Sequence, residues 1–274
     1  MNAKKLQQFI EKATIGTTIP TFVVEPLDGG GTRVRAKSVD NTTIGDVSVQ
    51  SLTVNERMPV KDARRLVEAL KFVGGDVDLE RKGATLFVTS KATGKLRYQR
   101  LGLVDEAYAK DYIPPSELKL EYAGSFTVSR SDLQDMASAA KSFGKESGSV
   151  RFVVQDGTLS LTTEGDTDAA GVELKVDFAN ARGRFGNPLF DVINSLSEDT
   201  VEVFISTDKD TYPMRLVERG EDIRAEYVIA PLDWESKAAE ADEEAPAEDA
   251  PAPTPPPATD GDADADDEDI PVEE

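Results

Sequence analysis

The sequence contains no cysteine and no histidine, which excludes several kinds of chemistry. Without these side chains the chain can form no disulfide framework, no cysteine or serine–histidine nucleophile and no typical zinc site. Its apolar runs have the length of strands and never approach the ~20 residues of a membrane-spanning helix. We therefore expect a soluble, cytoplasmic protein, in which only carboxylates and lysines remain as possible catalytic groups.

Positive charge is also scarce, because 31 Lys and Arg stand against 52 Asp and Glu, a formal net charge of −21. Residues 234–274 contain sixteen acidic residues and one lysine, so they carry −15 and leave −6 for residues 1–233. The same stretch holds seven of the fifteen prolines. It cannot bury enough apolar surface to offset the entropy of ordering. We therefore predict that residues 234–274 form a disordered acidic tail.

Residues 1–233 contain an internal duplication. The segment FVVEPLDGGGTRVRAKSVDNTTIGDVSV at 22–49 has a counterpart at 152–176, FVVQDGTLSLTTEGDTDAAGVELKV. Residues 59–81 and 187–207 then each show a helical pattern, a tight turn and a strand pattern. The strands TLFVTSKA and KLRYQRLGLV finally correspond to YPMRLVE and IRAEYVIAPL. The order predicts an α+β fold of two copies, each with a helix, three strands, a helix and three strands.

The predicted helices have one apolar face each, as placing residues 100° apart around the axis shows. The expected buried faces are Leu6, Phe9, Ile10 and Ala13; Val60, Ala63, Leu66, Val67 and Leu70; Leu133, Met136, Ala137, Ala140 and Phe143; and Leu189, Val192, Ile193 and Leu196. Three helices carry cations opposite the core, namely Lys4, Lys5, Lys12, Lys61, Arg64, Arg65, Lys71, Arg130 and Lys141. The fourth has none, and Arg182 and Arg184 precede it.

Cations gathered on three helices of an otherwise acidic chain indicate a surface that attracts phosphate backbones without reading sequence. The alternative is that these residues only solvate exposed helix faces. The glycines at 29–31 and 74–75 do not open a helix, so we interpret them as hairpin turns rather than a phosphate loop. Glu164, Asp166 and Asp168 lack the spacing of a calcium loop, which favours a solvated loop over a metal site.

The two-copy layout, the connector LVDEAYAKDYIPP and the ending EYVIAPL at 226–232 resemble the sliding clamps of the proliferating cell nuclear antigen family, archaeal type. TTEGDTDAAGVEL at 162–174 adds to this resemblance, which spans about residues 1–233. It implies a first clamp module at 1–104, an interdomain connector at 105–120 and a second module at 121–233. Each module would have two helices packed on antiparallel sheets.

The resemblance also implies a function without catalysis, cofactor or metal. Three chains would join head to tail, through edge strands near Lys95 to Leu103 and Glu173 to Asn180, into a ring around double-stranded DNA. The cations named above would face the duplex. A clamp loader ATPase would place the ring, and polymerases and other replication and repair proteins would dock by a short peptide. The matching pocket residues are Val39, Ile44, Tyr112, Ile113, Pro114, Val228, Ala230, Pro231 and Leu232.

Three features depart from the family's pattern. This chain begins inside the first helix, whereas the family opens with a strand of about nine residues; the fourth helix lacks cations; and the tail is far longer than usual. The leading hypothesis is a DNA sliding clamp at the nucleoid. The alternative is a clamp-like decoy or hetero-ring subunit that binds a resident clamp or its partners without encircling DNA. The tail solubilises the protein or, alternatively, competes for the cationic surface or for partners.

Overall fold

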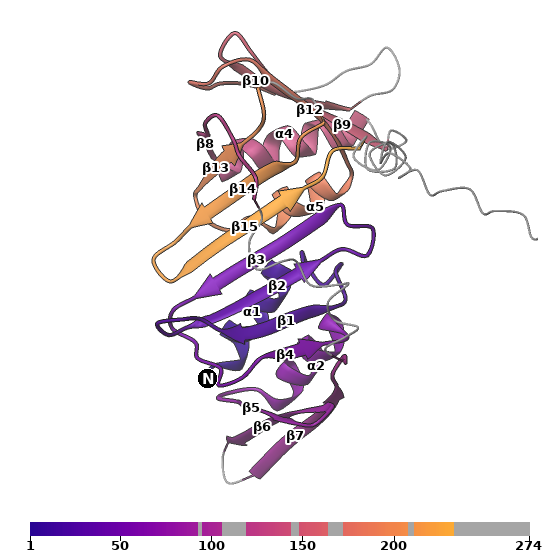
Figure 1. Ribbon diagram of the computed structural model, residues 1–274, viewed down its shortest axis with the longest axis vertical. Coiled ribbons are helices and arrows are strands. Elements are labelled where there is room, and N and C mark those ends of the chain that lie inside the picture. The colour runs from indigo at the N-terminus through magenta and orange to yellow at the C-terminus, as the bar shows by residue number, and fades with distance from the viewer. Residues whose placement is uncertain (93–94, 106–118, 144–147, 164–171, 208–210, 233–274) are drawn as a thin grey trace, which may run out of the picture.

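The computed structural model describes residues 1–92, 95–105, 119–143, 148–163, 172–207 and 211–232 (Figure 1). The first half contains α1 (Ala3–Ala13), β1 (Phe22–Pro26), β2 (Thr32–Lys37), β3 (Thr43–Val49), β4 (Met58–Val60), α2 (Ala63–Val73), β5 (Asp78–Lys82), β6 (Thr85–Ala92) and β7 (Lys95–Gly102). The second half contains β8 (Phe126–Ser129), α4 (Arg130–Phe143), β9 (Ser149–Gln155), β10 (Thr158–Thr163), β11 (Glu173–Lys175), β12 (Ala181–Gly186), α5 (Pro188–Ser195), β13 (Thr200–Phe204), β14 (Met214–Arg219) and β15 (Ile223–Ile229).

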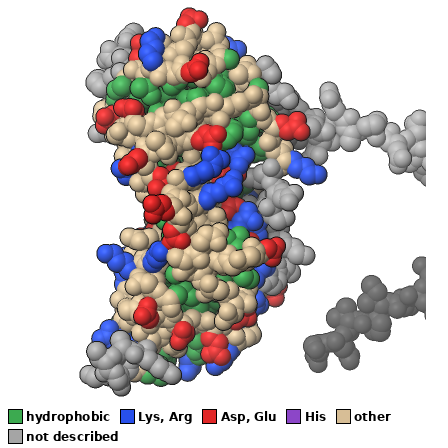
Figure 2. All heavy atoms as spheres, turned by 90° about the vertical axis from the view of Figure 1, so that its left-hand side faces the viewer, with side chains coloured by type: hydrophobic (Ala, Val, Ile, Leu, Met, Phe, Trp, Pro, Cys, Tyr) green, Lys and Arg blue, Asp and Glu red, His purple; other side chains and the backbone are tan. Residues whose placement is uncertain are grey.

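The described strands form three antiparallel sheets. The largest has the order β4-β1-β2-β3-β15-β14-β13-β8 and therefore combines strands from both halves of the chain. Its two halves meet where β3 pairs with β15, from Thr43 opposite Ile229 to Val49 opposite Ile223. A four-stranded sheet, β11-β10-β9-β12, and a three-stranded sheet, β5-β6-β7, lie at opposite ends of the molecule (Figure 1). Figure 2 shows the resulting two lobes with a narrower waist between them.

The predicted α+β class and the internal duplication are both present. From α1 to β7 and from α4 to β15 the elements follow one another in the same order. The buried faces predicted for the helices are buried wherever their side chains are described; the side chain of Phe143 is not. Caps support two helix starts, because Asp62 accepts a hydrogen bond from the backbone N–H of Arg65 and Ser129 accepts one from that of Asp132.

The prediction of three strands between the two helices of each copy is wrong, because four strands lie there in each half. The additional strands are β4 and β12. β4 carries Val60, so this residue belongs to a strand and not to the second helix, and Lys61 precedes that helix. Pro59 fits because β4 is an edge strand of the large sheet, where a missing N–H is tolerated. β12 covers Arg182 and Arg184, which were expected only to precede the fourth helix. Two of its buried residues, Ala181 and Gly183, are small and give a weak alternating pattern.

The two halves differ at one sheet edge. β8 pairs with β13 in the second half, and no described strand pairs with the corresponding edge of β5. Met1 instead exchanges backbone hydrogen bonds with Val77, of 2.9 and 2.7 Å. Farther along β5, Glu56 accepts a hydrogen bond from the Arg81 N–H at 3.0 Å. The loop before β4 thus satisfies part of an edge that a strand covers in the other half.

Candidate nucleic-acid interface and junction pockets

The predicted cationic residues lie mostly on exposed helix surface. Lys4, Arg64, Arg65, Lys71 and Lys141 are exposed. Three of the predicted cations have acidic neighbours. Arg65 pairs with Asp62 at 3.5 Å and Lys71 with Glu11 at 3.9 Å. Arg130 pairs with Asp199 at 3.6 Å. Exposed pairs of this kind hold their partners weakly, so these cations remain available to an incoming phosphate.

Lys12 is the exception, and its assignment to the exposed cationic face is wrong. Its side chain is only 7% exposed and pairs with Glu218 of β14, which is fully buried. It also donates a hydrogen bond to the hydroxyl of Ser197. A helical projection of α1 alone cannot reveal this, because the second half of the chain covers that side of the helix.

The buried Lys12–Glu218 pair joins the two halves of the molecule. The Glu218 carboxylate accepts hydrogen bonds from the backbone N–H groups of Ser197 and Glu198, at 2.6 and 2.8 Å. The hydroxyl of Tyr227 donates to the Lys12 carbonyl at 3.4 Å, and burial raises the pKa of this tyrosine well above its usual range. Lys12 therefore holds α1 against β14 and does not contact a ligand.

Lys5 also contacts the second half, through an ion pair with Asp222, and it donates a hydrogen bond to Ser51 of the first half. The side chain of Lys5 is 39% exposed and could still reach solvent. Arg182 and Arg184 are exposed on β12. The helix that follows, α5, carries no cation, as the sequence predicts. The cationic surface therefore comes from α1, α2 and α4.

An apolar pocket of about 410 Å³ lies where the two halves meet. Ala230, Pro231 and Leu232 line it, as the resemblance implied, and Leu232 is 41% exposed. Val39 is 66% exposed and precedes the lining loop Asp40–Thr42. Val228 is buried and pairs with Ile44 in the β3–β15 ladder, so these two support the wall and do not line it.

The remaining pocket residues divide into two sets. Tyr112, Ile113 and Pro114 lie outside the described residues. The sequence missed the lining residues at the end of β12, at the start of α5 and before β9, which are Gly186, Asn187, Pro188 and Gly148. It also missed Ile229 and the loop residues Asp40, Asn41 and Thr42. A signal for Asn187 and Pro188 did exist, since Asn followed by Pro is typical of a helix start.

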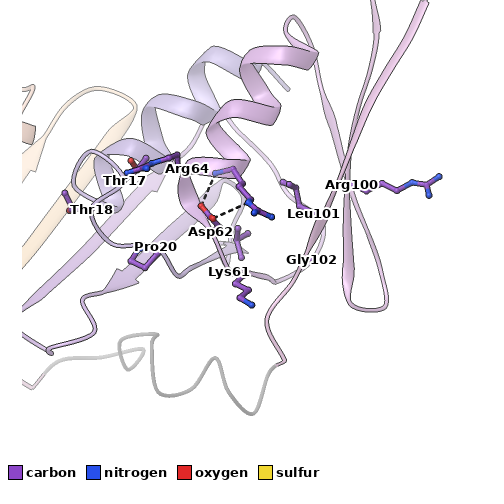
Figure 3. Close-up of a pocket in the computed structure, with 11 residues that line it drawn as sticks. Thr17, Thr18, Pro20, Lys61, Asp62, Arg64, Arg100, Leu101 and Gly102 are labelled. Atoms are coloured by element: carbon purple, nitrogen blue, oxygen red, sulfur yellow. Dashed lines mark hydrogen bonds and ion pairs between the residues drawn. The ribbon is translucent and has the colours of Figure 1, made fainter.

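A second cleft, of about 650 Å³, lies at the start of α2 (Figure 3). It occupies the place in the first half that the apolar pocket occupies in the second. An isolated β-bridge joins Val60 to Leu103 beside the cleft, and another joins Phe185 to Pro231 beside the apolar pocket. The Val104 N–H donates to the Pro59 carbonyl at 3.0 Å, and the Leu232 N–H donates to the Arg184 carbonyl at 2.9 Å. The two cavities are thus copies of one junction.

Two other kinds of site have no support in the described part of the chain. No group of three or more Asp or Glu residues there could hold a metal ion. Glu164, Asp166 and Asp168 lie outside it. Within the same residues, no helix has both the length and the apolar character needed to cross a membrane.

The architecture defines a class of fold, that of the DNA sliding clamps. The PCNA2–PCNA3 complex of Sulfolobus tokodaii matches with a TM-score of 0.65 and 17% identity over 85% of this chain and 97% of that chain. The A. fulgidus PCNA bound to the C-terminal region of FEN-1 matches with a TM-score of 0.65 and 19% identity, over 84% of this chain and 96% of that chain. The DnaN sliding clamp of Pseudomonas aeruginosa bound to griselimycin matches with a TM-score of 0.66 and 17% identity, over 85% of this chain and 64% of that chain.

At these identities the similarity establishes the fold, and function must be argued from the surfaces. Neither a protein-family model nor a curated protein matches the sequence. The PCNA structures match over almost their whole length and over about 85% of this chain, which confirms the predicted two-module α+β architecture.

Proposed function

We propose that the protein is a sliding clamp, a processivity factor without catalytic activity of its own. Three copies would close into a ring around double-stranded DNA at the nucleoid, after loading by a separate ATPase. Residues 1–104 and 121–233 would form the two modules, joined by the connector 105–120. The ring would tether a polymerase and other peptide-bearing replication and repair proteins.

The observation that carries this proposal is the pairing at the junction of the two halves. β3 and β15 pair within the chain, and their counterparts in the duplication are β11 and β7. Each of these two strands has one neighbour among the described strands, so each leaves a sheet edge open. Repeating the β3–β15 pairing between β11 of one chain and β7 of another gives a head-to-tail contact, and such contacts close into rings when the rotation allows.

The open edge of β7 carries exposed apolar side chains, as expected for a surface that a second copy covers. Leu96 is 61% exposed and Tyr98 is 53% exposed. We expect Leu96→Glu/Tyr98→Glu to keep the fold and the melting temperature while the solution mass falls from three chains to one. Light scattering measures the mass. Val39→Glu, a single change of the same kind at an exposed apolar side chain away from this edge, should leave the mass unchanged. A mass equal to that of the parent in both variants would argue against this edge.

The DNA contacts would be numerous and weak. Exposed cations on α1, α2 and α4 neutralise phosphates without recognising bases, so the ring could slide. Lys4, Lys5, Lys61, Arg64, Arg65, Lys71, Arg130 and Lys141 would make these contacts, with Arg182 and Arg184 from β12. Lys12 is excluded by its burial.

Charge reversal at two of these positions tests the DNA contact. We expect Arg64→Glu/Arg65→Glu to shorten retention on a closed circular duplex by about tenfold, because phosphate contacts supply sequence-independent binding. The melting temperature should not change, since both side chains are exposed. Lys37→Glu/Lys82→Glu reverses two charges on sheets away from the proposed ring contact and is the matched control. Equal retention of the parent on circular and linearised DNA would contradict encirclement.

The apolar pocket would receive the partner peptide. A cavity of about 410 Å³ lined by Ile229, Ala230, Pro231 and Leu232 can take one or two apolar side chains of a short segment. In a neighbouring structure the C-terminal region of FEN-1 is bound to A. fulgidus PCNA, which supports a peptide ligand for this fold. Leu232→Glu should weaken binding of a fluorescent clamp-binding peptide, measured by anisotropy.

Two observations favour the alternative of a decoy or hetero-ring subunit. α5 carries no cation, and among the described strands none pairs with the edge of β5 that corresponds to the β8–β13 pairing. A primer-extension assay with a cognate polymerase and loader separates the two functions. A clamp lengthens the products, whereas a decoy leaves them short or shortens those made with a resident clamp.

A further inference from the structure

The cleft at the start of α2 and the apolar pocket are duplicated positions with different chemistry. Asp62 and Asn187 occupy the same place before their helices, as do Lys61 and Gly186. The apolar pocket includes Asp40, and none of the described residues that line it is Lys or Arg. The cleft instead has Lys61, Arg64 and Arg65 on its rim (Figure 3). It therefore suits an acidic ligand, whereas its copy suits an apolar one.

The charges of the cleft are largely uncompensated. Among the described residues that line the cleft, Asp62 is the only one with a carboxylate, and it already caps α2 and pairs with Arg65. Within the described part of the chain, Lys61 and Arg64 have no acidic partner within ion-pair distance, and both are exposed. Arg100, on β7, points away from α2 and lies over the rings of Phe87 and Tyr98 (Figure 3). Three cations and one carboxylate thus leave the rim positive.

The cleft would stay accessible in a ring, a step that rests on the proposed function. The apolar pocket remains a cavity although the β3–β15 junction beside it is formed. The cleft is lined by the end of β7, as the apolar pocket is lined by the end of β15. Pairing of β7 with a second copy should therefore leave the cleft open to solvent.

We propose that the chain's own acidic tail docks in this cleft, through residues 260–269. Seven of these ten residues are Asp or Glu. The described chain ends at Leu232, in the apolar pocket, and residues 233–259 form a spacer of 27 residues that can span about 90 Å when extended. Because the acidic block is tethered to the same chain, its effective concentration at the cleft exceeds that of a free peptide, and opposite charge adds attraction. The tail thereby screens cations that would otherwise meet phosphates.

Photocrosslinking of the full chain tests this docking without DNA and without a ring. The chain has no cysteine, so Thr259→Cys provides a single thiol for a benzophenone probe beside the acidic block. We expect adducts, mapped by mass spectrometry, to concentrate in residues 61–65 and 100–104. Lys61→Glu/Arg64→Glu should lower their yield by about tenfold, and 0.5 M salt should lower it similarly by screening.

Two further variants separate docking from general charge attraction. Lys4→Glu/Lys141→Glu makes the same charge change outside the cleft and should leave the adducts in place. Replacing the seven acidic residues of 260–269 by Asn and Gln should remove them. Adducts spread over α1 and α4, adducts that persist when the cleft is reversed, or no adducts at all would each overturn the proposal. None of these outcomes depends on whether the protein encircles DNA.

Discussion

Gly45→Ala should lower the stability of the protein by about 3 kcal/mol or more, because there is no room for a Cβ at this position of β3. A methyl group there would lie 2.1 Å from the carbonyl oxygen of Ala13 and 3.0 Å from its carbonyl carbon. Both atoms belong to the backbone, so the end of α1 would have to move away from the sheet. Urea unfolding followed by circular dichroism measures the loss.

Gly102→Ala is the matched control for this prediction. Gly102 is a strand glycine with no atom within 4 Å of the position of an added Cβ. We expect a change of no more than about 0.5 kcal/mol. If Gly45→Ala proved equally mild, the close approach of α1 to β3 would be wrong, and with it the packing that sets the cationic side of α1.

Glu218→Ala should lower the free energy of unfolding by about 3–5 kcal/mol, because it leaves the Lys12 ammonium buried without its partner. The substitution also removes the acceptor for the backbone N–H groups of Ser197 and Glu198. A fall in the unfolding midpoint is the expected readout. Asp222→Ala removes the more exposed Lys5–Asp222 pair and should cost about 1 kcal/mol or less.

A double variant distinguishes loss of the ion pair from loss of packing. Lys12→Met/Glu218→Gln replaces the buried cation by an apolar chain and keeps a carbonyl oxygen for the two N–H groups. We expect it to recover most of the stability lost in Glu218→Ala, because a buried pair can be replaced together at little cost. A double variant as unstable as the single one would show that Lys12 and Glu218 do not act as a pair.

The sequence was most informative where one physical signal dominates. The 100° periodicity located the buried faces of all four helices, because each packs a single stripe against a sheet. The duplication predicted the repeated element order even though individual segments share few residues. Both signals are local or repeated, so neither requires knowledge of how distant segments meet.

The errors arose where tertiary packing decides. Lys12 looks like any exposed lysine on its helix, and only the packing of β14 against α1 makes it buried. β4 has three residues and β12 turns Ala181 and Gly183 inward, so neither gives a strong alternating pattern. The pocket residues Asn187 and Pro188 were missed because the start of α5 reaches the terminal strand only in the folded chain.

The solution mass of the full chain tests the central claim most directly. A head-to-tail ring of three chains predicts a particle of about 89 kDa by light scattering, three times the 29.6 kDa of one chain. This mass should persist on dilution into the working concentration range. A particle that remains at 29.6 kDa at every concentration would contradict the homotrimeric clamp.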